Sequence, residues 1–280
     1  MNKQHEGLII KDFLVSREEF SLEENTRHGY LQTLPQPKQS ELSKYYESDD
    51  YISHTDSKKG LLAFLYQQVK GYSLNKKVST IKKLNSGSGN LLDIGAGTGD
   101  FLKEAKDKGW NVSGVEPNEK ARGIAAKKNI QLYDSMDQVL GQKFDVVTLW
   151  HVLEHLPNLE ASIHKIESLV NSGGTLIIAV PNFNSHDAVH YKEFWAAYDV
   201  PRHLWHFSQS SIRSLFSSEF KLVKTKPMIF DAFYVSLLSE KHKTGNAFSL
   251  RAFWIGFRSN LAAMKSTEYS SLIYCFKKTE

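Results

Sequence analysis

The residues best suited to chemistry follow an apolar stretch at residues 91–94, where Gly95, Gly97 and Gly99 stand at alternate positions. Glycine adopts positive φ and lets a ligand approach the backbone closely, and these glycines lead directly into a helical pattern. Glu116 ends the next apolar stretch, 21 residues after Gly95. A carboxylate at that place can accept hydrogen bonds from both hydroxyls of a ribose. The pairing predicts a binding site for an adenosyl compound.

The spacing of the glycines distinguishes between adenosyl ligands. The dinucleotide pattern G-x-G-x-x-G places its third glycine three residues after the second, whereas this loop reads G-x-G-x-G and has Asp100 there. A carboxylate at a helix amino terminus would repel a diphosphate. S-Adenosylmethionine has no phosphate and carries cationic sulfonium and ammonium groups, so it suits the loop better. A nicotinamide-dependent oxidoreductase is the less favoured alternative.

Three segments resemble motifs of the class I S-adenosylmethionine-dependent methyltransferases, in the type 11/12/23 small-molecule subgroup: LLDIGAGTGDF at 91–101, VEP at 115–117 and FDVVTLWHVLEH at 144–155. The resemblance covers about residues 90–225 and implies a methyltransferase that uses S-adenosylmethionine on a small-molecule acceptor. A catalytically silent cofactor-binding protein stays open as an alternative. The residues implied to bind or flank the cofactor are Asp93, Gly95, Ala96, Gly97, Gly99, Glu116, Pro117, Asp134, Ser135, Met136, Trp150 and His151.

A possible metal motif lies within the third segment. His151, Glu154 and His155 match H-x-x-E-H, a zinc-peptidase pattern that needs a long helix, but Pro157 follows within two residues. The lone Cys275 excludes an intramolecular disulfide and any multi-cysteine metal site within one chain. We therefore expect no metal ligands.

Strands and helices alternate after residue 90, which is typical of a parallel sheet covered by helices. Together with the resemblance, this predicts a Rossmann-like, doubly wound, mostly parallel sheet of seven strands with an antiparallel edge strand. The expected strands are 91–94, 112–115, 130–133, 144–149, 175–180, 220–225 and 271–276, and the expected helices are 100–108, 119–128, 159–170 and one capped by Ser208.

The segment before this domain reads as a β-hairpin followed by helices that form a lid or linker. The hairpin resembles a zinc ribbon, but Asn25 and His28 stand where that pattern has a cysteine pair, so we expect it to be metal-free. The expected units are the hairpin at 1–39, the lid or linker at 40–89, and the methyltransferase domain at 90–280 with substrate-side insertions at 182–207 and 231–268.

The first insertion is expected to line the acceptor pocket, because it follows the strand at 175–180 and holds many polar aromatic side chains. His203 and His206 are the candidate proton acceptors, since the ordinary histidine pKa lies near neutrality. Either ring could instead only hydrogen-bond the backbone to hold its loop. We expect oxygen as the methyl acceptor.

Composition excludes several classes of protein. The chain has 280 residues, 41% of them hydrophobic, and 35 basic against 31 acidic side chains, which gives a net charge of +4. Acidic and basic residues are interspersed, so we expect no nucleic-acid partner. No apolar run approaches the roughly 20 residues needed to span a bilayer. A cytoplasmic protein is expected, and a homodimer is left open.

Overall fold

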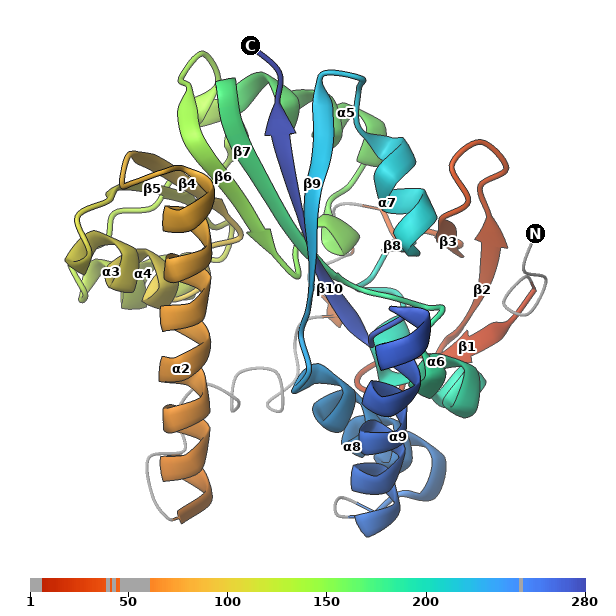
Figure 1. Cartoon of the computed structure of the whole chain (residues 1–280). Helices are drawn as coiled ribbons and strands as arrows, with labels where there is room; N and C mark the ends of the chain where they lie inside the picture. The colour runs from red at the N-terminus through yellow and green to blue at the C-terminus, as the bar shows by residue number, and fades with distance from the viewer. Residues whose placement is uncertain (1–6, 39–40, 42–43, 46–60, 247–248) are drawn as a thin grey trace.

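The computed structural model describes residues 7–38, 41, 44–45, 61–246 and 249–280, with only the backbone described for 61–70. Its centre is a twisted six-stranded sheet in the order β5-β4-β6-β7-β10-β9 (Figure 1). The strands are β4 (Asn90–Ile94), β5 (Asn111–Val115), β6 (Phe144–Trp150), β7 (Val170–Pro181), β9 (Phe220–Pro227) and β10 (Ser271–Lys278). Strands β4 to β7 are parallel, and β10 runs antiparallel to both β7 and β9.

The predicted fold class is confirmed, but two details of the sheet were wrong. The sheet has six strands because residues 130–133 form only the isolated bridge between Tyr133 and Val115. After Tyr133 the chain turns away at Ser135, whose side chain caps the short helix η2 (Met136–Val139). The antiparallel strand is also not at the edge: β10 lies between β7 and β9, where both of its faces are covered.

Helices cover both faces of this sheet. Alternate residues of β4 point to opposite faces: Leu91 packs with Ile81 and Leu102, whereas Leu92 packs with Ile166. None of the described helices is both long enough and apolar enough to cross a membrane. The α-helices are α2 (Leu61–Leu84), α3 (Asp100–Asp107), α4 (Glu119–Ala126), α5 (Leu159–Leu169), α6 (His186–Tyr191), α7 (Gln209–Leu215), α8 (Asp231–Thr244) and α9 (Leu250–Ser266). Single 3-10 turns are η3 (Leu153–His155), η4 (Lys192–Phe194) and η5 (Ala196–Tyr198).

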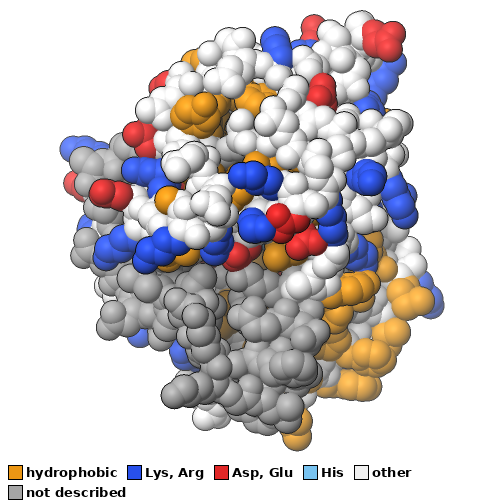
Figure 2. All heavy atoms as spheres, turned by 90° about the vertical axis from the view of Figure 1, so that its left-hand side faces the viewer, with side chains coloured by type: hydrophobic (Ala, Val, Ile, Leu, Met, Phe, Trp, Pro, Cys, Tyr) orange, Lys and Arg blue, Asp and Glu red, His pale blue; other side chains and the backbone are white. Residues whose placement is uncertain are grey.

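Helix α2 and the α8–α9 hairpin extend away from the sheet on opposite sides in Figure 1. The face shown in Figure 2 has basic and acidic side chains interspersed, as the composition predicted, and hydrophobic side chains gathered at its lower right. The first half of the expected lid at 40–89 falls largely outside the described residues.

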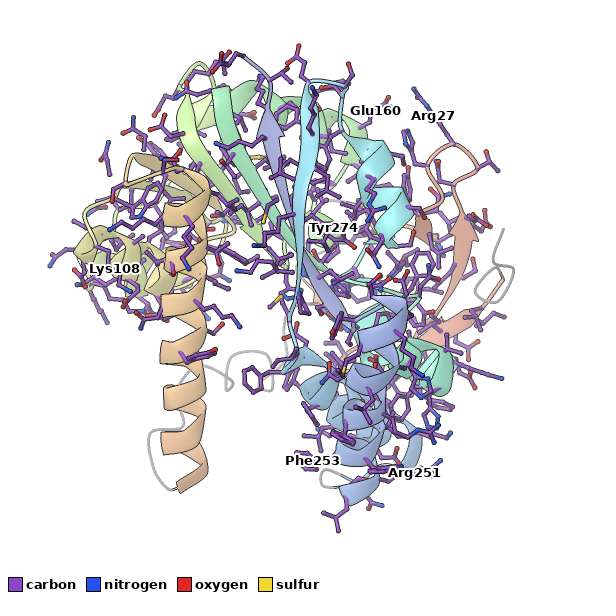
Figure 3. The ribbon with its side chains drawn as sticks, viewed as in Figure 1. Arg27, Lys108, Glu160, Arg251, Phe253 and Tyr274 are labelled. Atoms are coloured by element: carbon purple, nitrogen blue, oxygen red, sulfur yellow. The ribbon has the colours of Figure 1, made fainter. Side chains whose placement is uncertain are left out.

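A second, antiparallel sheet joins the N-terminal strands to the first insertion. Its order is β1-β2-β3-β8, so the expected hairpin has a third strand, and that strand pairs with β8. Asn25 accepts hydrogen bonds from the backbone N–H groups of Arg27 and His28, and thereby shapes the β2–β3 loop. Arg27 also lies 3.8 Å from Glu160 on α5 (Figure 3). The strands are β1 (Ile9–Lys11), β2 (Glu19–Glu24), β3 (Leu31–Leu34) and β8 (Trp205–His206).

Candidate functional site

The glycine loop lies at the carboxyl end of β4, and each of its glycines has a positive φ. A Cβ on Gly95 would lie 2.3 Å from Val152 Cγ2, and a Cβ on Gly99 would lie 3.0 Å from the Cβ of Ala125. These two glycines are therefore required by packing. A Cβ on Gly97 would meet nothing within 4 Å. The open space beside Gly97 is where a ligand can touch the backbone.

Glu116 completes this loop from the end of β5. Its Oε2 atom accepts a hydrogen bond from the Gly97 N–H at 2.9 Å, and its Oε1 atom accepts one from the Asn118 N–H at 2.9 Å. Each carboxylate oxygen keeps further acceptor capacity, which leaves room for two ribose hydroxyls. The structure thus brings together the loop and the acid that the sequence paired.

The residues expected to flank the adenine lie next to Glu116. The Glu116 N–H donates to the carbonyl of Tyr133 at 2.9 Å, so Asp134 and Ser135 follow immediately beside it. Pro117 and Asp134 are exposed, and Met136 packs against the main core. All of these residues are at the same end of the sheet as the glycine loop.

Asp93 and Trp150 lie beneath and beside the loop. Burial raises the pKa of Asp93 to about 7, although a 2.6 Å hydrogen bond from Thr148 and the charge of Lys77 oppose that rise. The Nζ atom of Lys77 lies 4.3 Å from the centre of the Trp150 ring. The indole Nε1 of Trp150 is buried and has no hydrogen-bond partner among the described residues.

Lys77 is a site residue that the sequence analysis missed. It belongs to a lysine-rich part of α2 that reads as a solvated helix face. In the structure, burial lowers the pKa of Lys77, while Asp93 and Asp231 act in the opposite direction. Only the packing of α2 against the sheet reveals that this lysine faces the site.

His151 follows β6 and lies between two carboxylates. Its φ is +58°, its Nδ1 lies 3.4 Å from Glu154, and its Nε2 lies 3.3 Å from Asp231. Burial alone would lower the pKa of His151, but hydrogen bonding to Asp231 and Glu154 outweighs it and raises the pKa to about 9. The imidazole is therefore a cation at neutral pH. Asp231, the first residue of α8, was expected only as part of an insertion.

Glu154 also faces two further histidines. One ligand atom from each of Glu154, His155 and His203 lies within 4.8 Å of the others. The Nδ1–H of His155 donates to the carbonyl of Arg202 at 3.0 Å, and that of His203 donates to Ala197 at 2.8 Å. In the neutral rings this places the lone pair on Nε2. Two such rings and a buried carboxylate could hold a proton or a divalent cation.

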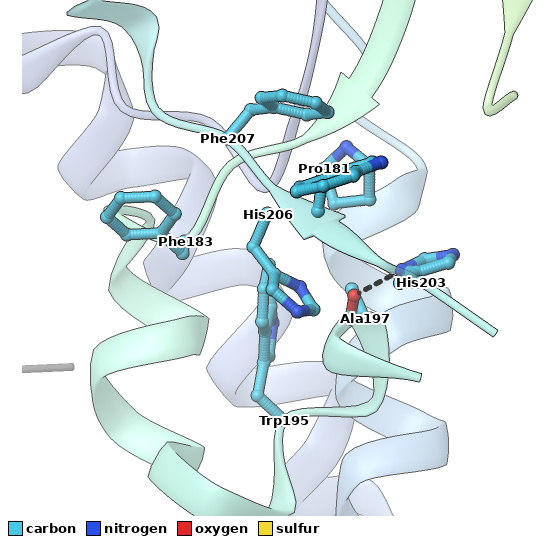
Figure 4. Close-up of a pocket in the computed structure, with 8 residues that line it drawn as sticks. Pro181, Phe183, Trp195, Ala197, His203, His206 and Phe207 are labelled. Carbon is cyan, nitrogen blue, oxygen red and sulfur yellow. Dashed lines mark hydrogen bonds between the residues drawn. The ribbon is translucent and has the colours of Figure 1, made fainter. Parts of the chain in front are cut away.

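His203 and His206 line one pocket, although their surroundings differ (Figure 4). The Thr33 hydroxyl donates to the carbonyl of His203 at 2.7 Å, so the Nε2–H of His206 donates to that hydroxyl at 2.9 Å. Burial holds the pKa of His206 well below its usual value. The pocket is lined by Pro181, Phe183, Trp195, Ala197, His203, Trp205, His206 and Phe207.

Comparison with known proteins assigns the chain to a family. The methyltransferase-domain family matches residues 65–222, which is more than half of the chain. The chain belongs to the methyltransferase-domain family. This confirms the predicted methyltransferase family.

Individual relatives agree with this assignment over part of their length. A ubiquinone biosynthesis O-methyltransferase of Azoarcus sp. (strain BH72) is 34% identical over 107 residues, which are 34% of this chain and 45% of that protein. The chain spans about half the length of the curated relatives it matches. The plantazolicin methyltransferase BpumL, solved in complex with SAH, has a TM-score of 0.51 at 14% identity, over 85% of this chain and 94% of its own.

A second solved structure has the same degree of likeness. A putative sarcosine dimethylglycine methyltransferase from Galdieria sulphuraria has a TM-score of 0.51 at 12% identity, over 76% of this chain and 86% of its own. At such low identity, these two structures show a shared fold.

Proposed function

We propose that this methyltransferase moves the methyl group of S-adenosylmethionine to a hydroxyl oxygen of a small molecule, with His203 as the proton acceptor. The observation that carries the proposal is the position of His203. Its ring lines the pocket, its Nδ1–H donates to the carbonyl of Ala197, and its Nε2 lies 4.0 Å from the Asp199 carboxylate. That arrangement suits a general base whose partner carboxylate stabilises the protonated ring.

The residues beside the glycine loop fit the cofactor. Gly97 leaves open space against the backbone, and Glu116 can accept ribose hydroxyls. When bound, S-adenosylmethionine supplies an electrophilic methyl group. The protein's part is to hold the acceptor oxygen in line with that methyl group and to exclude water.

A hydroxyl acceptor needs a group that takes its proton as the oxygen–carbon bond forms and the sulfur–carbon bond breaks. His203 Nε2 takes that proton, and the Asp199 carboxylate, 4.0 Å from Nε2, lies beside the imidazolium that results. His155 can stay neutral beside them, because burial and the charge of His203 lower its pKa to about 4. The Azoarcus relative is named as an O-methyltransferase, which supports oxygen as the acceptor atom.

The experiment is a turnover assay with methyl-labelled S-adenosylmethionine, a metabolite extract and a panel of phenols and alcohols. Mass spectrometry should find a labelled methyl ether and an equal amount of S-adenosylhomocysteine. Labelling of amines alone would contradict the oxygen assignment. Cofactor binding without turnover on any acceptor would favour the alternative of a catalytically silent binding protein.

A further inference from the structure

Helix α9 packs against the protein mainly through small residues, whereas most of its large apolar residues face outward. The buried side carries Ala252, Gly256, Ser259 and Ala263, with Ile255 as its one large apolar residue. A Cβ on Gly256 would lie 2.9 Å from the Ala232 carbonyl oxygen of α8, so the two helices approach very closely. This contact fixes the rotation of α9 about its axis.

The opposite side of α9 is a continuous apolar surface, which we call the α9 outer face. Its residues follow one another at intervals of four and three, so they share one side of the helix. Each is between 44% and 76% exposed. The α9 outer face consists of Leu250, Trp254, Phe257, Leu261 and Met264.

A row of cations runs along one flank of the α9 outer face. Arg251, Arg258 and Lys265 are spaced seven residues apart and are all exposed, and α9 contains no acidic residue. Figure 3 labels Arg251 near the lower end of α9, and Figure 2 shows hydrophobic side chains gathered at the lower end of the molecule. Lys241 and Lys243, at the adjoining end of α8, are also exposed.

We propose that the α9 outer face binds the surface of an anionic lipid bilayer. A helix with Trp, Phe and Leu on one side and Lys or Arg beside them lies flat in the membrane interface, with its apolar side among the acyl chains. The flanking cations then reach lipid phosphates. The charge complementarity favours this occupant over a second copy packed antiparallel, which would bring the two rows of cations side by side.

The fluorescence of Trp254 can test this proposal directly. Trp254 is 57% exposed, whereas Trp110, Trp195 and Trp205 are buried and Trp150 is partly buried. With the full chain, vesicles of phosphatidylglycerol and phosphatidylcholine should shift its tryptophan fluorescence to shorter wavelength, and brominated lipids should quench it. Trp254→Phe should remove most of this optical response while cosedimentation with the vesicles persists.

Variants test the apolar face and the cations separately. Trp254→Ser with Leu261→Ser, and Arg251→Glu with Arg258→Glu, should each weaken cosedimentation with anionic vesicles at least about tenfold. Matched controls on the exposed edge strand β9, Val223→Ser and Lys221→Glu with Lys224→Glu, should leave it unchanged. Circular dichroism and cofactor affinity should stay at wild-type values in every variant, because the changed side chains face solvent.

Three outcomes would overturn the proposal. The first is no binding to vesicles with or without phosphatidylglycerol, and the second is binding that the α9 variants do not weaken. The third is a concentration-dependent dimer, seen by light scattering, that Trp254→Ser with Leu261→Ser abolishes while the vesicles bind nothing. That last result would assign the α9 outer face to a second copy of the chain.

Discussion

The Nη2 atom of Arg202 lies 3.0 Å from Oδ1 of Asp12, and both side chains are almost fully buried. Asp12 precedes β2 in the N-terminal sheet, and Arg202 belongs to the insertion that carries the candidate base. The same Nη2 lies 2.7 Å from Asp199, and Nη1 donates to the carbonyl of Tyr45 at 3.0 Å. One guanidinium therefore links the N-terminal segment to the insertion that lines the pocket of His203 and His206.

The first prediction concerns this link. Arg202→Met should lower the free energy of unfolding by about 3–5 kcal/mol, because it leaves the buried Asp12 carboxylate without its cation. Lys103→Met is the matched control, since it breaks an exposed i,i+4 pair with Asp107 and should cost less than about 0.5 kcal/mol. Urea denaturation followed by circular dichroism measures both. If both variants lose the same small free energy of unfolding, the buried link is not what holds the N-terminal sheet in place.

Asp12 also gives this link a pH dependence. Burial alone would raise the pKa of Asp12, but hydrogen bonds from Arg202 and the Ser16 backbone outweigh it and lower the pKa to about 2. Because the folded-state pKa is lowered, the contribution of Asp12 to stability is present above its ordinary value of 3.8 and is lost as the pH falls through about 2.

The second prediction concerns the open space beside Gly97. Wild-type protein should bind S-adenosylmethionine with a micromolar dissociation constant, about −8 kcal/mol by calorimetry. Gly97→Val should abolish binding, because its side chain fills the space where the ligand meets the backbone. Gly141→Val is the control: that glycine also has a positive φ and open surroundings, but it lies outside the loop. Comparable loss of affinity in both variants would trace the effect to backbone strain alone.

The third prediction concerns the charge on His151. Its folded-state pKa of about 9 is raised above 6.5, so its contribution to stability is full below pH 6.5 and is lost as the pH rises through about 9. Asp231→Asn removes one carboxylate and should lower that pKa, which NMR titration can follow. The stability difference between wild type and Asp231→Asn should be larger at pH 6 than at pH 10. A His151 that titrates alike in both proteins would contradict the pairing.

The fourth prediction is that activity needs no metal. His151 lies 3.4 Å from Glu154 and carries a positive charge, which opposes a cation at that carboxylate. Asn25 is engaged with its own loop, and His28 lies 3.2 Å from Ser214. Dialysis against EDTA should leave turnover unchanged, and elemental analysis should find well below one metal per chain. If EDTA abolishes activity and Zn²⁺ or Mn²⁺ restores it, activity needs a metal. If the metal no longer restores activity in His155→Ala, then Glu154, His155 and His203 are its ligands.

The parts of the site that sequence could predict are local ones. The glycine loop and Glu116 each end a strand, and parallel neighbouring strands bring their carboxyl ends together, so spacing along the chain was enough to pair them. The fold class followed from the alternation of strands and helices for the same reason. The expected strand at 130–133 was wrong because one residue pairs before the chain turns at Ser135.

The parts that sequence could not predict depend on contacts between distant segments. Lys77 faces Trp150 only because α2 packs across the sheet, and Asp231 reaches His151 only because α8 begins there. The pairing of β3 with β8 joins residues more than 170 positions apart, such as Leu31 and His206. No periodicity or spacing within a single segment predicts these contacts.

The fifth prediction separates the two pocket histidines, which the sequence treated as equivalent. His203→Ala should lower turnover by roughly 10²–10⁴ and leave cofactor affinity nearly unchanged, because it removes the proton acceptor but not the glycine loop. His206→Ala should act mainly on stability, by about 1–3 kcal/mol, since it leaves the buried Thr33 hydroxyl without its donor. Thr33→Val is the matched control and should lose stability while keeping turnover. Steady-state kinetics, calorimetry and urea denaturation on the three variants distinguish these effects. If His206→Ala loses turnover and His203→Ala does not, His206 is the base. If neither variant loses turnover, this pocket does not hold the acceptor.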